Sequence, residues 1–137
     1  MVTNNRRNTL LGLTALATIG AGRSAFATTQ KAGIIMVGAS WCPYCKAAAR
    51  QLYTATLQWG WPVVIASSDN RAIEPFEHVI PSRDHPLTAE INQLPTTLVV
   101  APSQDAVLAA FVGFEGPLKY LAQLGTALHA AETEGHV

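Results

Sequence analysis

The sequence predicts an α/β domain with the element order βαβαββα, in which helices flank a mixed four-stranded sheet. Three observations support this fold class. Short apolar runs typical of buried strands recur along the chain. Helix-like stretches separate the first three of these runs, and strand–helix–strand units imply parallel pairing. The turn at 102–105 separates the last two runs, which predicts an antiparallel hairpin.

The elements follow from these patterns in chain order. Strands are expected over 34–39, 62–67, 96–101 and 106–112, and helices over 43–59, 87–94 and 116–131. Gly60 should end the first helix, because glycine is the preferred residue just after a helix. A single apolar stripe should bury the last helix, and it consists of Leu118, Leu121, Leu124 and Leu128.

Residues 1–27 have the pattern of a cleaved signal peptide. A short basic segment precedes an apolar run, and Ala25-Phe26-Ala27 is an A-x-A cleavage signal. The run is too short to span a bilayer, which takes about 20 residues. The pair Arg6-Arg7 resembles a twin-arginine export signal, and a general secretory signal stays open. We expect cleavage after Ala27, which leaves one domain over 28–137 in the periplasm.

Charge and cysteine content narrow the function classes. Six basic and nine acidic residues remain after the expected cleavage, a net charge near −3. This balance argues against nucleic acid or an anionic membrane surface as a partner. Both cysteines of the chain lie in one Cys-x-x-Cys, so they do not form a disulfide framework.

Cys42 and Cys45 lie between an apolar strand and a helix, which is the arrangement for dithiol–disulfide exchange. The unpaired N–H groups and the dipole of a helix start stabilise a thiolate, so Cys42 should attack and Cys45 should resolve. A zinc site needs four ligands, and no metal-type spacing joins the histidines, which are His78, His85, His129 and His136. A haem attachment needs histidine where Lys46 stands. A purely structural disulfide would stabilise so short a loop only weakly. We expect no metal and no organic cofactor.

The chain resembles the thioredoxin superfamily over about residues 33–131. The resemblance is carried by three segments in order, namely Trp41–Lys46, Leu94–Leu98 and Phe111–Phe114. It implies the minimal thioredoxin-like fold, with a cis Leu94–Pro95 bond beside the dithiol. It also implies a substrate-binding surface, made of Trp41, Pro43, Tyr44, Leu94, Pro95 and Thr96.

This sequence departs from the thioredoxin pattern in informative ways. The pair between the cysteines is Pro43-Tyr44, as in glutaredoxins, whose glutathione-binding signals are absent. The buried acid of thioredoxin would fall at Met36, so another group or water must carry the proton of the resolving cysteine. The connection over 67–95 is longer than usual.

Together these features predict a periplasmic thiol–disulfide oxidoreductase that reduces disulfides in exported proteins. A membrane electron donor would re-reduce it, because the periplasm is kept oxidising. The alternatives left open are a disulfide oxidant or isomerase, and a non-catalytic redox-sensing binding domain.

Overall fold

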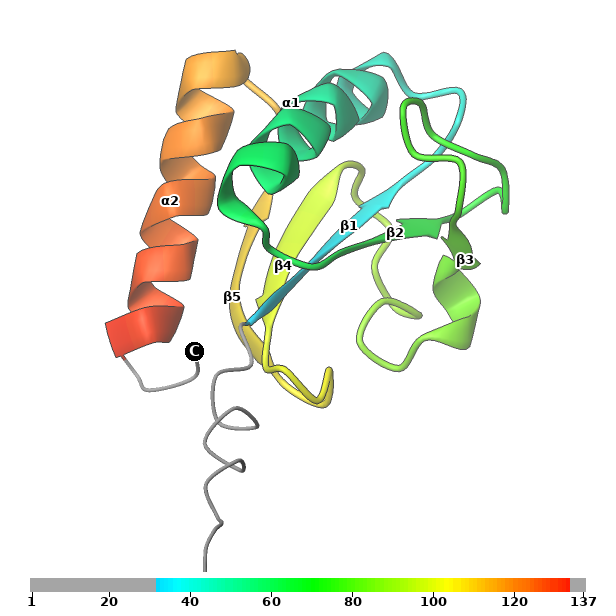
Figure 1. The fold of residues 1–137 in the computed structure, drawn as a ribbon. Coiled ribbons are helices and arrows are strands. Elements are labelled where there is room, and N and C mark those ends of the chain that lie inside the picture. Colours follow the sequence, from blue (N-terminus) through cyan, green and yellow to red (C-terminus); the bar gives the residue numbers. More distant parts are fainter. Residues whose placement is uncertain (1–31, 134–137) are drawn as a thin grey trace, which may run out of the picture. The chain divides into compact units, whose positions relative to one another are not determined.

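A computed structural model describes residues 32–133 of the chain, and the signal peptide expected over 1–27 lies outside the described residues. Figure 1 shows the elements in chain order. They are β1 (Gly33–Gly38), α1 (Pro43–Trp59), β2 (Val63–Ser67), β3 (Ile80–Pro81), a 3-10 helix (Ser82–Asp84), β4 (Thr96–Val100), β5 (Val107–Val112) and α2 (Pro117–Thr133).

The sheet is mixed, as predicted, with the strand order β3-β2-β1-β4-β5. β1 pairs in parallel with β2 and antiparallel with β4, and β4 and β5 form the expected hairpin. The predicted number of four strands was wrong, because the connection after β2 contributes a fifth. Ile80 and Pro81 pair in parallel with Ala66 and Ser67 and form one edge of the sheet.

The predicted helix over 87–94 was also wrong, since this segment consists of turns and irregular chain. Side chains bind the backbone groups there. The Thr88 hydroxyl donates to the Ser82 carbonyl at 2.6 Å, and the Leu87 N–H donates to the His85 ring at 3.0 Å. Such bonds compete with helical ones and favour turns.

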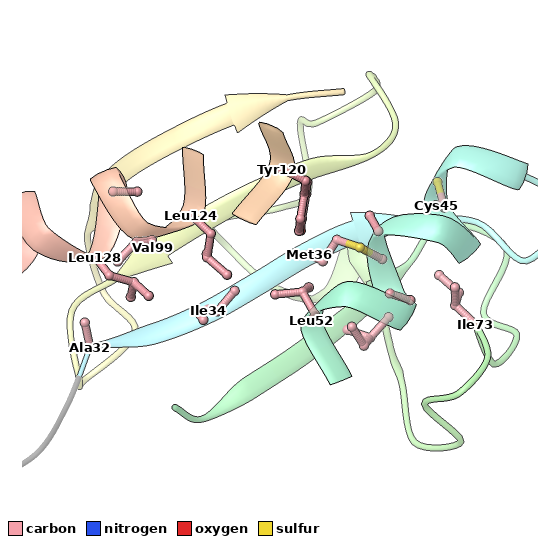
Figure 2. Close-up of a cluster of buried hydrophobic side chains, with 14 of the residues drawn as sticks. Ala32, Ile34, Met36, Cys45, Leu52, Ile73, Val99, Tyr120, Leu124 and Leu128 are labelled. Atoms are coloured by element: carbon pink, nitrogen blue, oxygen red, sulfur yellow. The ribbon is translucent and has the colours of Figure 1, made fainter. Parts of the chain in front are cut away.

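α1 and α2 pack on the same face of the sheet and enclose the larger apolar core. Figure 2 shows this core, with Ala32 and Leu128 at one end and Cys45 at the other. The opposite face carries a smaller cluster of Ile35, Val37, Ala66, Leu98 and Val100, onto which Leu87 and Ile91 of the long connection pack.

The bounds of α1 and α2 are close to those predicted, but the buried face of α2 differs. α1 ends at Gly60, which has φ 71° and donates its N–H to the Thr56 carbonyl at 2.8 Å. In α2 the buried stripe contains Tyr120, Leu124 and Leu128. Leu118 was wrongly placed in that stripe and is 85% exposed. At 100° per residue it lies about 200° around the helix from Tyr120.

Candidate functional site: a dithiol at the start of α1

Cys42 is the N-cap residue of α1 and has extended backbone angles, φ −91° and ψ 113°. Its Sγ accepts the N–H of Cys45 at 3.2 Å, so the sulfur satisfies one of the donors that a helix start leaves unpaired. Pro43 occupies the first helical turn, where its missing N–H leaves no hydrogen bond unmade. The sulfur of Cys42 therefore lies where donor and helix dipole both favour negative charge.

The two thiols differ in environment. Both cysteines are buried, Cys45 completely and Cys42 with 5% of its surface exposed. Burial raises the pKa of the Cys45 thiol well above its ordinary value, and its contact with Cys42 acts in the same direction. Cys45 is thus held as a thiol near neutral pH.

Gly38, the last residue of β1, provides the space that Cys45 occupies. A Cβ at Gly38 would lie 3.1 Å from both Cβ and Sγ of Cys45, and 3.2 Å from the Ile73 side chain. Sequence reasoning did not single out Gly38. A glycine ending the strand four residues before the first cysteine is the signal that could have indicated it.

Pro95 lies at the same end of the sheet. The Leu94–Pro95 bond is cis, as the resemblance implied, and a second cis bond joins Glu74 and Pro75. Val37 pairs with the residue after Pro95, so the register brings Pro95 to the end of β1 from which the dithiol loop leaves. Pro95 is buried, and its carbonyl accepts the Gly113 N–H at 2.7 Å.

The other residues predicted to contact substrate divide into two groups. Trp41 and Tyr44 are 68% and 63% exposed and adjoin the dithiol in the chain, and Pro43 between the cysteines is also exposed. Leu94 is half-buried. Thr96 is buried, and its hydroxyl donates to the Gln93 carbonyl at 2.6 Å, so this group is engaged within the protein.

The buried interior includes a pair of hydroxyl groups that bond each other. Tyr120 and Thr97 are both buried and share a hydrogen bond of 2.8 Å. Met36 is paired with Thr97 across the sheet, and Figure 2 shows Tyr120 pointing toward Met36. Burial raises the pKa of Tyr120, so its phenol remains neutral. Met36, which stands where thioredoxin has its buried acid, therefore has apolar and neutral polar neighbours.

Asp69 is a charged group at the same end of the sheet as the dithiol, and sequence reasoning missed it. Its carboxylate accepts hydrogen bonds from Ser40 and Ser67, and its charge raises the pKa of Cys45 further. The available signal was topological. β1 and β2 are parallel neighbours, so the residues that follow each strand meet at one edge of the sheet.

Within residues 32–133, no three histidine, cysteine or acidic side chains come together as a metal site would require. In the same part of the chain, no helix has the length and apolar character to cross a membrane.

The fold and the dithiol define a class of protein, the thioredoxin-like thiol–disulfide oxidoreductases. The sequence matches the family TraF, described as "F plasmid transfer operon protein", over residues 25–116, which is more than half of the chain. The chain therefore belongs to the TraF family. Among proteins with curated descriptions, no relative matches.

Solved structures share the fold. A thio-disulfide isomerase from Thermus thermophilus is 28% identical with a TM-score of 0.51, and the match covers 74% of this chain and 82% of that one. A putative thiol:disulfide interchange protein DsbE from Chlorobium tepidum is 20% identical with a TM-score of 0.53, covering 76% and 84%. The periplasmic thioredoxin SoxS from Paracoccus pantotrophus is 16% identical with a TM-score of 0.51, covering 74% and 99%.

Proposed function

We propose that the protein is a periplasmic oxidoreductase that reduces disulfides in exported proteins, with Cys42 as the attacking and Cys45 as the resolving sulfur. The asymmetry of the dithiol supports this proposal best. Cys42 caps α1 and accepts a backbone N–H, whereas Cys45 is fully buried behind it. One sulfur thus lies at the positive end of the dipole of α1 with an N–H donor, and the other is held as a thiol.

The reaction follows from this arrangement. The Cys42 thiolate attacks one sulfur of the substrate disulfide, that S–S bond breaks, and the departing substrate sulfur takes a proton. Cys45 then loses its proton and attacks Cys42, which releases the second substrate sulfur as a thiol. The substrate gains two electrons and two protons, and the dithiol becomes a disulfide. A membrane electron donor returns the two electrons in this proposal.

The exposed rim around Cys42 supports a protein substrate. Trp41 and Tyr44 present large aromatic surfaces to solvent on either side of Cys42. Exposed aromatic side chains of this kind are frequent in protein interfaces. We propose that these two residues and Pro43 contact the substrate chain, and that the chain passes along the segment of Leu94, Pro95 and Thr96.

Export is proposed from the sequence and the comparisons together. Residues 1–27 have a signal-peptide pattern, which leaves 28–137 as the mature domain. One structural neighbour is described as a periplasmic thioredoxin. The description of the family as a transfer operon protein favours, among exported substrates, the proteins of a plasmid-transfer apparatus.

A second candidate is an isomerase that reshuffles wrong disulfides, since the Thermus thermophilus neighbour carries that description. Both activities use the same first step, attack by Cys42. They differ in whether Cys45 must complete each cycle, because an isomerase can release its substrate by a substrate thiol instead. A redox-sensing domain would catalyse neither disulfide reduction nor disulfide isomerisation.

Insulin reduction by the purified mature protein, with dithiothreitol as the electron source, tests the proposal. Turnover is expected for the wild type and not for Cys42→Ser. Cys45→Ser should accumulate mixed disulfides with exported proteins, because no sulfur is left to resolve them. Cys42→Ser is its matched control and should trap almost none. Absence of turnover, or equal trapping by both variants, would contradict the proposed mechanism.

A further inference from the structure

Three donor groups converge on the Asp69 carboxylate. The Ser40 N–H lies 3.3 Å from each of its oxygens. The Ser40 hydroxyl donates to Oδ2, and the Ser67 hydroxyl donates to Oδ1 at 2.8 Å. Charge-assisted bonds of this kind are stronger than neutral ones. The carboxylate is therefore firmly held by two separate parts of the chain.

These bonds connect the dithiol loop with the end of β2. Ser40 directly precedes Trp41 and Cys42 in the chain. Ser67 is buried as the last residue of β2, and its hydroxyl also accepts the Arg71 N–H at 3.0 Å. A shift of Asp69 would thus move the chain immediately before Cys42.

Asp69 carries its charge over the whole physiological pH range. The hydrogen bond from the Ser40 hydroxyl is the main reason why the pKa of Asp69 falls to about 2, and Ser67 acts in the same direction. Among the described residues, the charges of Cys42 and Asp69 raise the pKa of Cys45, and the charge of Cys45 in turn raises the pKa of Tyr120 in α2.

We propose that Asp69 is a positioning residue of the dithiol, which fixes the segment from Ser40 to Cys42 and places a negative charge at the end of β1 and β2 from which the dithiol loop leaves. The inference rests on the proposed function and adds a determinant of its redox equilibrium. The proposed attack requires a thiolate, and a negative charge nearby disfavours that thiolate and with it the reduced form in which it occurs. Removing that charge should move the equilibrium toward the reduced dithiol.

Asp69→Asn tests this, because asparagine keeps the shape and removes the charge. Equilibration against glutathione buffers should show a dithiol/disulfide ratio higher by about two- to fivefold than the wild type, the range of partly exposed charge interactions. The pH at which alkylation of the dithiol reaches half its maximal rate should fall. Asp69→Glu retains the charge on a longer arm and should keep the wild-type equilibrium more closely.

The matched control is Asp105→Asn. Asp105 also accepts a serine hydroxyl, that of Ser103 at 2.6 Å, but it lies in the β4–β5 turn at the opposite end of the sheet. It should change neither readout. If Asp69→Asn does not fold, Asp69→Ser replaces it with the same expectation. A folded Asp69→Asn or Asp69→Ser variant that matches Asp105→Asn in both readouts would overturn the inference.

Neither readout needs a protein substrate, so the two proposals fail separately. If Asp69→Asn shifts the dithiol/disulfide equilibrium but the wild type does not reduce insulin, the proposed function is refuted and the inference is supported. If the wild type reduces insulin and Asp69→Asn leaves the dithiol/disulfide equilibrium unchanged, only the inference is refuted.

Discussion

Replacing Gly38 with alanine tests how tightly the dithiol is packed. The added Cβ would lie 3.1 Å from Cβ and Sγ of Cys45 and 3.2 Å from the Ile73 side chain. These separations are below the optimum of about 3.5–4.0 Å between carbon atoms. Both neighbours are fully buried, and Cys45 belongs to the first turn of α1. Since overpacking a core typically costs about 1–3 kcal/mol, we expect the free energy of unfolding to fall by about 2 kcal/mol.

Urea unfolding of the reduced protein, followed by circular dichroism, would show this loss as a lower midpoint at an unchanged slope. Gly125→Ala is the matched control, because nothing lies within 4 Å of its Cβ and it is inside α2. That change should stabilise the protein by up to about 1 kcal/mol. A wild-type midpoint for Gly38→Ala would refute the packing argument, since the core would then have room beside Cys45.

Three further predictions follow from the core, the carboxylate and the dithiol. Tyr120→Phe leaves the buried Thr97 hydroxyl without its partner, and urea unfolding should show a loss of about 1–3 kcal/mol; an unchanged midpoint would contradict it. The pKa of Asp69 is lowered from 3.8 to about 2, so the stability it contributes is present above pH 3.8 and is lost as the pH falls toward 2. Asp69→Asn should flatten the pH dependence of unfolding in that window, and a wild-type slope would disprove the assignment. The Pro43-Tyr44 pair predicts a reduction potential of about −200 to −230 mV for the dithiol. The double variant Pro43→Gly with Tyr44→Pro should make the dithiol more reducing. A wild-type potential near −270 mV, that of thioredoxin, would oppose this argument.

The sequence predicted the parts of the fold that depend on strong local signals. The run before Cys42 has no polar residue and became the central strand, and Gly60 ended α1 where glycine is expected. The cis bond before Pro95 followed from a resemblance in the order of motifs rather than from the residue itself. These features need no knowledge of distant contacts, which is why they could be predicted.

The errors all depend on distant or competing contacts. β3 has two residues, too few to show an apolar period, and it forms because Ile80 lies beside β2. The expected helix over 87–94 is replaced by turns because Thr88 bonds the backbone through its side chain. Leu118 fits an apolar stripe in sequence, but Tyr120 instead occupies the core. Asp69 was missed because its partner Ser40 is distant in sequence.

The two edges of the sheet differ in their capacity to join another chain. The β3 edge is two residues long and includes Pro81, which has no N–H to offer a further strand. In the described part of the chain, β5 has a strand partner only on its β4 side, and Val107 and Val112 are 43% and 51% exposed (Figure 1). Self-association at high concentration should therefore begin by strand addition at β5, and a lysine at Val112 would oppose it.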